Sequence, residues 1–79
     1  MIQLLLFAGL EEKIGHKTLE ISFTGKTVAQ LKTYIEETYQ LDRGSLKTMM
    51  VAINEEFATN EETLKSADTV AFIPPVSGG

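Results

Sequence analysis

The two most apolar runs of this sequence lie near its two ends, and they constrain the fold more than any other feature. One is IQLLLFA at residues 2–8, and the other is TVAFI at residues 69–73. Apolar runs of this length predict strands that are covered on most sides. A chain of 79 residues makes one small domain with a single core. We therefore expect the two runs to lie side by side at the centre of one sheet.

The segment after the first run predicts a loop, a second strand and one helix. Residues 9–15 are charged and bounded by glycines, which indicates a loop. Residues 17–23 (KTLEISF) alternate apolar and polar side chains, as a half-buried strand does. Thr27 and Gln30 have the spacing of a helix capping box, and apolar residues at helical spacing then continue to about residue 40.

The second half of the chain predicts short strands. Residues 49–53 indicate a third strand, Asn54 a turn, and residues 56–58 a very short fourth strand. The order is therefore β-β-α-β-β-β, and the helical connection allows the first and last strands to run parallel. That order fits an α+β roll in which one main helix crosses a mixed sheet, the β-grasp or ubiquitin-like arrangement. We expect this domain to span residues 1–74 and an extended tail to span residues 75–79.

Composition excludes several classes of function. The chain has no cysteine, which excludes disulfides and thiolate metal sites and makes a reducing cytoplasm the expected compartment. Its net charge of −4 argues against nucleic acid and anionic membranes as partners. No apolar run approaches the roughly 18 residues that a membrane-spanning helix needs. His16 stands alone in the predicted loop without a second ligand, so no metal site is expected.

The sequence finishes in FIPPVSGG at residues 72–79, which predicts an extended end. Pro74 and Pro75 favour a stiff polyproline II conformation. Gly78 and Gly79 have no side chains to block a narrow channel or to shield the terminal carbonyl carbon. A free carboxylate is a poor acyl donor, so a partner would have to activate it. The activated end could take an amine to give an amide, or a sulfur to give a thiocarboxylate, and without cysteine no other group could carry a transferable sulfur.

Four segments carry a resemblance to a known family. They are MIQLLLFAGLEEKIG at the start, TVAQL at the helix start, VAINEE at the third strand, and ADTVAFIPPVSGG at the end. Over essentially its whole length the chain resembles the MoaD family of sulfur carriers, the small subunits of molybdopterin synthase. The last segment is the most specific, because a terminal Gly-Gly alone occurs across ubiquitin-like proteins. The resemblance implies the same β-grasp fold.

The resemblance also implies a reaction cycle at the C-terminal residue. A ubiquitin-activating-type enzyme adenylates Gly79 with ATP, and sulfur from a donor protein replaces the adenylate to give a thiocarboxylate. The tail then enters the active site of the large subunit, where its sulfur goes to a cyclic pyranopterin precursor and forms the dithiolene of molybdopterin. That tail consists of Pro74, Pro75, Val76, Ser77, Gly78 and Gly79.

The implied assembly is a heterotetramer with two small subunits at the ends of a large-subunit dimer. Catalytic and pterin-binding side chains belong to the large subunit. The chain is therefore expected to serve molybdenum cofactor biosynthesis as an accessory subunit and not as an enzyme on its own. It is expected to contribute no catalytic side chain and to bind neither cofactor nor metal.

Strand parity predicts where a partner would dock. The residues expected to face the helix are Leu4, Leu6, Val70 and Phe72. Their neighbours point to the opposite side of the sheet, where an apolar patch would consist of Leu5, Phe7, Phe57 and Ile73. Such a patch is typical of a partner surface, and ordinary packing at the sheet edge is the alternative.

Two other functions use an activated diglycine. One is a sulfur carrier for thiazole formation in thiamin synthesis, against which the PPV before SGG argues. The other is a ubiquitin-like protein modifier that is conjugated through Gly79 to lysines of its targets. A non-covalent ubiquitin-like binding module would have no use for a free glycine terminus. The mass of the chain isolated from its own cells discriminates between them.

Overall fold

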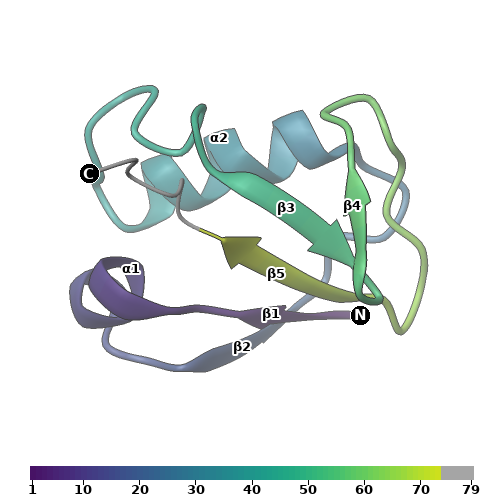
Figure 1. Cartoon of the computed structure of the whole chain (residues 1–79), viewed down its shortest axis with the longest axis horizontal. Helices are drawn as coiled ribbons and strands as arrows, with labels where there is room; N and C mark the ends of the chain where they lie inside the picture. The colour runs from purple at the N-terminus through teal and green to yellow at the C-terminus, as the bar shows by residue number, and fades with distance from the viewer. Residues whose placement is uncertain (74–79) are drawn as a thin grey trace.

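The computed structural model describes residues 1–73. They form a mixed five-stranded sheet in the order β2-β1-β5-β3-β4. One long helix, α2, crosses a single face of this sheet (Figure 1). This arrangement confirms the predicted α+β β-grasp roll. The elements are β1 (Ile2–Leu5), α1 (Ala8–Ile14), β2 (Thr18–Ile21), α2 (Val28–Thr38), β3 (Met50–Ile53), β4 (Glu56–Ala58) and β5 (Thr69–Ile73).

The two apolar runs pair at the centre of the sheet, as predicted. β1 and β5 run parallel, with Leu4 opposite Val70 and Leu5 opposite Ala71. The outer neighbours of this pair, β2 on β1 and β3 on β5, are both antiparallel, and β4 follows β3 at the other edge. The first strand ends at Leu5 rather than at residue 8, because the chain turns there into α1.

Residues 9–15 were expected to form a loop, and this prediction is wrong. They lie almost entirely in the short helix α1, which is followed by Gly15 in the left-handed conformation at φ 88°. The N–H of Gly15 donates to the carbonyl of Glu11 at 2.8 Å. Leu10 and Ile14, four residues apart, are both buried and attach the helix to the core. The charged residues between them occupy the outer side of the helix, which is why the segment resembles a loop in sequence.

The helix α2 begins at the predicted cap. The Gln30 N–H donates to the hydroxyl oxygen of Thr27 at 3.2 Å, and the Thr27 N–H donates to the side-chain carbonyl of Gln30 at 2.9 Å. These two bonds make a complete capping box. The stripe predicted to face the sheet includes Val28, Leu31 and Ile35, and all three are completely buried. Neither helix within residues 1–73 has the length and apolar character needed to cross a membrane.

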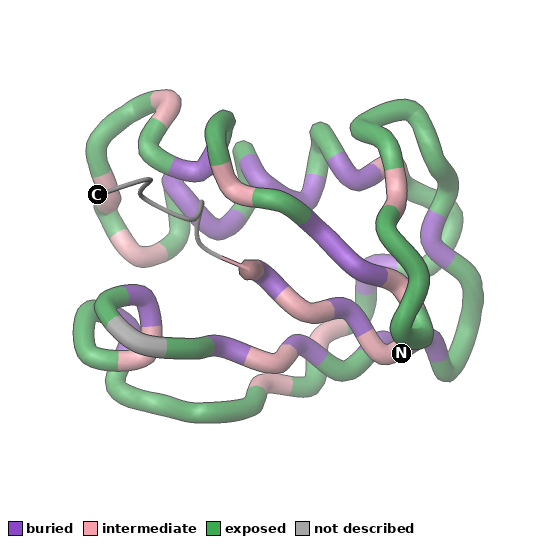
Figure 2. Tube along the Cα trace, in the orientation of Figure 1, coloured by how far each residue is buried: buried purple, intermediate pink, exposed green. Residues whose placement is uncertain are grey.

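The core lies between α2 and one face of the sheet. In Figure 2 buried and half-buried residues alternate along β5, as the period of a strand requires. The residues predicted to face the helix are each at most 2% exposed, which confirms the parity: Leu4, Leu6, Val70 and Phe72. The long connection before β5 is fixed to this core by Leu64, which is 1% exposed.

Two charged side chains of α2 hold the connection between α2 and β3. The N–H groups of Gly44 and Leu46 donate to the two carboxylate oxygens of Glu36 at 3.0 and 2.9 Å. The ammonium of Lys32 donates to the carbonyl of Met49 at 3.0 Å. The backbone donors hold the pKa of Glu36 below its ordinary value, whereas burial lowers the pKa of Lys32. Hydrogen bonds as well as apolar packing therefore hold this connection against α2.

Candidate functional site

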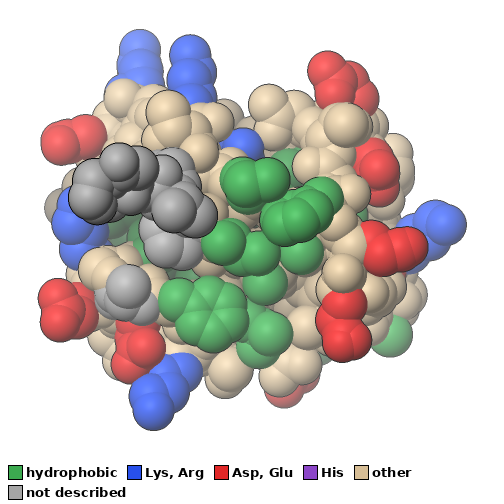
Figure 3. Space-filling view, in the orientation of Figure 1, with side chains coloured by type: hydrophobic (Ala, Val, Ile, Leu, Met, Phe, Trp, Pro, Cys, Tyr) green, Lys and Arg blue, Asp and Glu red, His purple; other side chains and the backbone are tan. Residues whose placement is uncertain are grey.

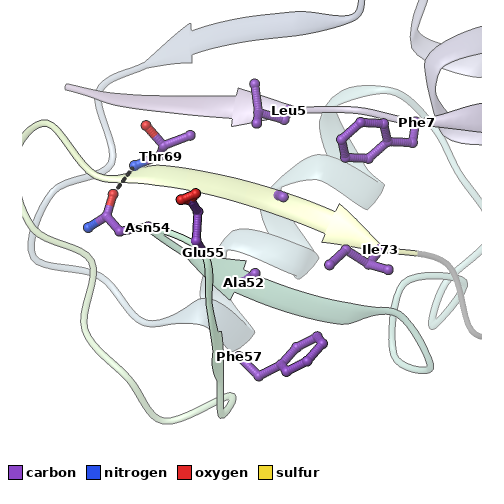
Figure 4. Close-up of a pocket in the computed structure, with 9 residues that line it drawn as sticks. Leu5, Phe7, Ala52, Asn54, Glu55, Phe57, Thr69 and Ile73 are labelled. Atoms are coloured by element: carbon purple, nitrogen blue, oxygen red, sulfur yellow. Dashed lines mark hydrogen bonds between the residues drawn. The ribbon is translucent and has the colours of Figure 1, made fainter.

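The face of the sheet opposite α2 carries a groove of about 650 Å³. The four residues predicted to form an apolar patch all line it: Leu5, Phe7, Phe57 and Ile73. They come from β1, the turn before α1, β4 and the end of β5, and Figure 4 shows their side chains around one opening. The parity of the strands thus placed distant residues on the same surface. Sequence reasoning missed the other residues that line the groove, which are Ala52, Asn54, Glu55, Thr69 and Ala71.

The groove exists because large and small residues share one row across four strands. Leu5 of β1 lies opposite Ala71 of β5, Ala71 lies opposite Ala52 of β3, and Ala52 lies opposite Phe57 of β4. Two methyl groups therefore form the floor, and two large side chains stand at the ends of the row. This register could be found from sequence only after the strand order was known.

The two phenylalanines of the groove are unusually exposed. Phe57 is 68% exposed and Phe7 is 46% exposed, whereas Phe72 on the opposite face is fully buried. Figure 3 shows hydrophobic side chains gathered on this face of the molecule. Exposed apolar surface of this kind, hollowed at its centre, is typical of a protein contact site. Packing among residues 1–73 leaves most of the Phe57 side chain exposed.

The turn that leads into β4, the strand of Phe57, is hydrogen-bonded to the start of β5. Asn54 and Glu55 form the two-residue turn with φ values of 51° and 73°, which is the left-handed geometry of a tight hairpin. The Asn54 N–H donates to the carbonyl of Thr69 at 2.8 Å, and the Thr69 N–H donates to the Asn54 side-chain carbonyl at 3.0 Å. The Asn54 side-chain NH₂ donates to Asp68 at 2.9 Å. Asn54 is therefore the predicted turn former and also the residue that positions this wall of the groove.

The Phe57 end of the groove is acidic. Glu55 lines the groove itself, and Glu56 and Glu62 line the neighbouring cleft on the other side of Phe57. Among the described residues that line these two hollows, Lys65 is the single cation. Figure 3 shows carboxylates along the margin of the hydrophobic surface on that side. The apolar floor thus has a border of negative charge.

The predicted carrier residue, Gly79, lies outside the described residues. So do the other residues of the predicted tail, and with them the domain boundary expected at residue 74. The last described residue is Ile73, which ends β5 and lines the groove. The groove and the start of the predicted tail therefore meet at one end of β5.

His16, the two neighbouring methionines and Tyr34 do not belong to the groove. His16 is exposed, and residues 1–73 contain no group of three acidic or histidine side chains that could hold a metal ion. Met49 packs partly buried against the core, whereas Met50 is exposed on the sheet. The ring of Tyr34 packs against that of Phe23, with centroids 5.0 Å apart.

Comparisons with known proteins agree with the fold and the predicted family. The model of the ThiS family matches residues 4–79, and the chain belongs to this family. A molybdopterin synthase sulfur carrier subunit from Escherichia coli is 32% identical over the full length of both chains. Another from Chlamydomonas reinhardtii is 37% identical, covering 99% of this chain and 98% of that one. The resemblance to the small subunits of molybdopterin synthase is confirmed.

A solved structure shares both the fold and its extent. Small archaeal modifier protein 1 from Haloferax volcanii is 29% identical and superposes with a TM-score of 0.79. The match covers 99% of this chain and 98% of that protein. The β-grasp assignment therefore rests on the sheet order and on an independent structural match.

Proposed function

We propose that this chain is the sulfur carrier subunit of a molybdopterin synthase and that it carries sulfur as a thiocarboxylate on Gly79. The observation that carries the proposal is the full-length match to sulfur carrier subunits. The model of the ThiS family also extends to Gly79. The absence of cysteine supports it, because no thiol of the chain could hold the sulfur.

The chemistry needs one activation of the Gly79 carboxylate and one substitution at its carbonyl carbon. The Gly79 carboxylate attacks the α-phosphorus of ATP, pyrophosphate leaves, and an acyl adenylate forms on a ubiquitin-activating-type enzyme. Sulfur at the sulfide level, supplied by a donor protein, then attacks the acyl carbon; the C–S bond forms, the bond to AMP breaks, and the thiocarboxylate remains. Adenylation is required because a carboxylate oxygen is too poor a leaving group for direct displacement. The chain itself supplies the carboxylate and binds no cofactor, while the partner enzyme uses the ATP.

The groove is the proposed docking site for the large subunit. Leu5, Phe7, Phe57 and Ile73 give it an apolar surface on which, among residues 1–73, the two phenylalanine rings stay exposed. Because Ile73 is also where β5 ends, a partner bound in the groove would lie next to the start of the tail. Docking and delivery would then be coupled by position, which raises the effective concentration of the terminus at the partner's active site.

The proposed assembly is the one that the resemblance to the small subunits of molybdopterin synthase implies. Two carrier chains bind a dimer of large subunits as a heterotetramer in the cytoplasm, and the catalytic residues lie in the large subunit. The carrier is an accessory subunit and not an enzyme on its own. The acidic composition agrees with this role, because a phosphorylated precursor would be held by a more basic partner.

The test is the intact mass of the chain. The purified chain is incubated with its adenylating enzyme, ATP and a sulfur donor, and fragmentation then locates the change. We expect one oxygen-to-sulfur exchange, confined to Gly79. An unchanged mass, or sulfur at any other residue, would refute the proposal.

A second candidate is a protein modifier, which the match to small archaeal modifier protein 1 favours. Conjugation would join Gly79 to a lysine amine and release AMP from the same adenylate. Extracts of the native cells distinguish the two candidates. For a modifier we expect lysines of several proteins to be joined by an amide bond to Gly79. A carrier for thiazole formation would instead gain sulfur on Gly79 but fail to support synthesis of molybdopterin.

A further inference from the structure

The row of residues across the groove defines the shape of what can enter it. Leu5 and Phe57 lie at its ends, with Ala71 and Ala52 between them on adjacent strands. Three strand spacings separate the two ends, which is about 14 Å. Among residues 1–73, the two alanine methyl groups form a low floor, and the groove of about 650 Å³ lies above them. This space has room for one bulky apolar side chain between the two walls.

The negative charge at one end of the groove favours an occupant that carries positive charge there. Glu55 lines the groove, and Figure 4 shows its carboxylate on the groove side of the β3–β4 turn. In the cleft on the other side of Phe57 three carboxylates face one ammonium, which leaves the potential there negative; these residues are Glu56, Glu62, Asp68 and Lys65. The exposed ring of Phe57 can itself attract a cation over its face. A second copy of this chain fits poorly, because two acidic margins and two net charges of −4 would meet.

We infer that the groove binds a bulky apolar side chain of a partner protein and that an arginine or lysine of the same partner contacts Glu55 beside Phe57. The inference rests on the proposed function, because it takes the large subunit as that partner. It adds the chemistry by which the partner is recognised: an apolar anchor above Ala71 and Ala52, with a cation at the β4 end.

The apolar half is tested by filling the space. In Ala71→Leu the new side chain occupies the floor of the groove without removing any contact of the core. The matched control is Ala29→Leu on the exposed side of α2. Binding to the purified large subunit of the same organism is measured by calorimetry, with thermal unfolding of each variant as the check on folding. We expect the Kd to rise at least about tenfold for Ala71→Leu and to stay constant for Ala29→Leu.

The charged half is tested by reversing one charge. Glu55→Lys replaces one non-glycine residue by another in the left-handed conformation, so the backbone strain of the turn stays the same. The control Glu37→Lys on α2 changes the net charge of the chain by the same amount. We expect Glu55→Lys to weaken binding about three- to tenfold relative to Glu37→Lys at low salt, with a smaller difference at high salt. Equal affinities of these two variants at low salt would overturn the assignment of the cation.

The outcomes separate this inference from the proposed function. If wild-type chain gains sulfur on Gly79 and binds the large subunit, yet Ala71→Leu binds within twofold of wild type, the inference is wrong and the proposed function stands. If Gly79 gains no sulfur, the proposed function fails whatever the groove binds. If the isolated chain dimerises and Ala71→Leu makes it monomeric, the groove binds a second copy, and the inference is again overturned.

Discussion

The two faces of the sheet are built from alternate residues of the same strands, yet they have opposite fates. On the face under α2, Leu4, Val70 and Phe72 are fully buried. On the other face, Leu5 and Ile73 stay half-buried and Phe57 is 68% exposed. Both faces are apolar, which is why the two terminal runs are nearly continuous in sequence. Apolar character alone therefore does not tell which face stabilises the chain.

The two faces differ in the process to which their side chains contribute free energy. A side chain under α2 leaves water when the chain folds, so its burial stabilises the folded state. A side chain in the groove keeps much of its contact with water until a partner covers it, so it contributes to association instead. Substitutions on the two faces should separate into changes of stability and changes of affinity.

The largest expected effect is on the covered face. Phe72→Ala should lower the free energy of unfolding by about 3–5 kcal/mol, because it leaves a cavity in a fully buried position. Phe57→Ala is the matched control, and we expect a change below about 0.5 kcal/mol for it. Urea denaturation of both variants gives the comparison. Similar losses for the two phenylalanines would contradict the division between the faces.

The next effect is on the groove. Phe57→Ala should weaken binding to the large subunit by about 2 kcal/mol, which is roughly a thirtyfold rise in Kd, because an exposed aromatic wall of a groove is a typical hot spot. Calorimetry with the purified large subunit measures it. Tyr34→Ala is the control, since Tyr34 is an exposed aromatic on the helix side of the molecule. If the two substitutions raised the Kd equally, the groove would not be the docking surface.

The third effect is on stability and concerns Glu36, a charged residue of α2. Glu36→Gln should destabilise the chain by about 1–3 kcal/mol at pH 7, because Gly44 and Leu46 lose charge-assisted hydrogen bonds. The folded pKa of Glu36 is lowered, so its stabilisation is fully present above the ordinary carboxyl pKa of about 4.3 and disappears as the pH falls through the lower folded value. Urea midpoints of wild type and variant should therefore converge below about pH 4. A gap that widened on acidification would show that the carboxylate is not the stabilising form.

The smallest expected effect concerns the wall of the groove. Asn54→Gly keeps the left-handed turn but removes the side-chain bonds to Asp68 and Thr69. We expect a loss of stability of about 1 kcal/mol together with a few-fold weaker binding of the large subunit, since Phe57 is less firmly positioned. Thermal unfolding and calorimetry measure the two changes. Unchanged affinity would mean that the turn does not position the wall.

Much of the fold could be predicted from the sequence because local patterns determine it. The central strands follow from two apolar runs, the start of α2 from the Thr27–Gln30 pair, and the patch from strand parity. The helix α1 could not be predicted in this way. It has seven residues, and what holds it is the burial of Leu10 and Ile14 in a core whose other members are mostly distant in sequence.

The details of the groove were beyond sequence reasoning for a related reason. Alanine in a strand carries no signal of its own, and the gap above Ala52 and Ala71 exists only because β3 and β5 align them between Leu5 and Phe57. The bond between Asn54 and Asp68 likewise joins residues fourteen positions apart. Long-range register produces both features, and a single sequence does not display it.

In the proposed function, one face of the domain docks the partner and the Gly79 carboxylate carries the sulfur. The most direct measurement is the intact mass of a variant with one alanine added after Gly79, treated with the adenylating enzyme, ATP and sulfur donor. We expect no gain of sulfur, while the affinity of this variant for the large subunit stays within about twofold of wild type. A thiocarboxylate on the added residue would contradict the central claim.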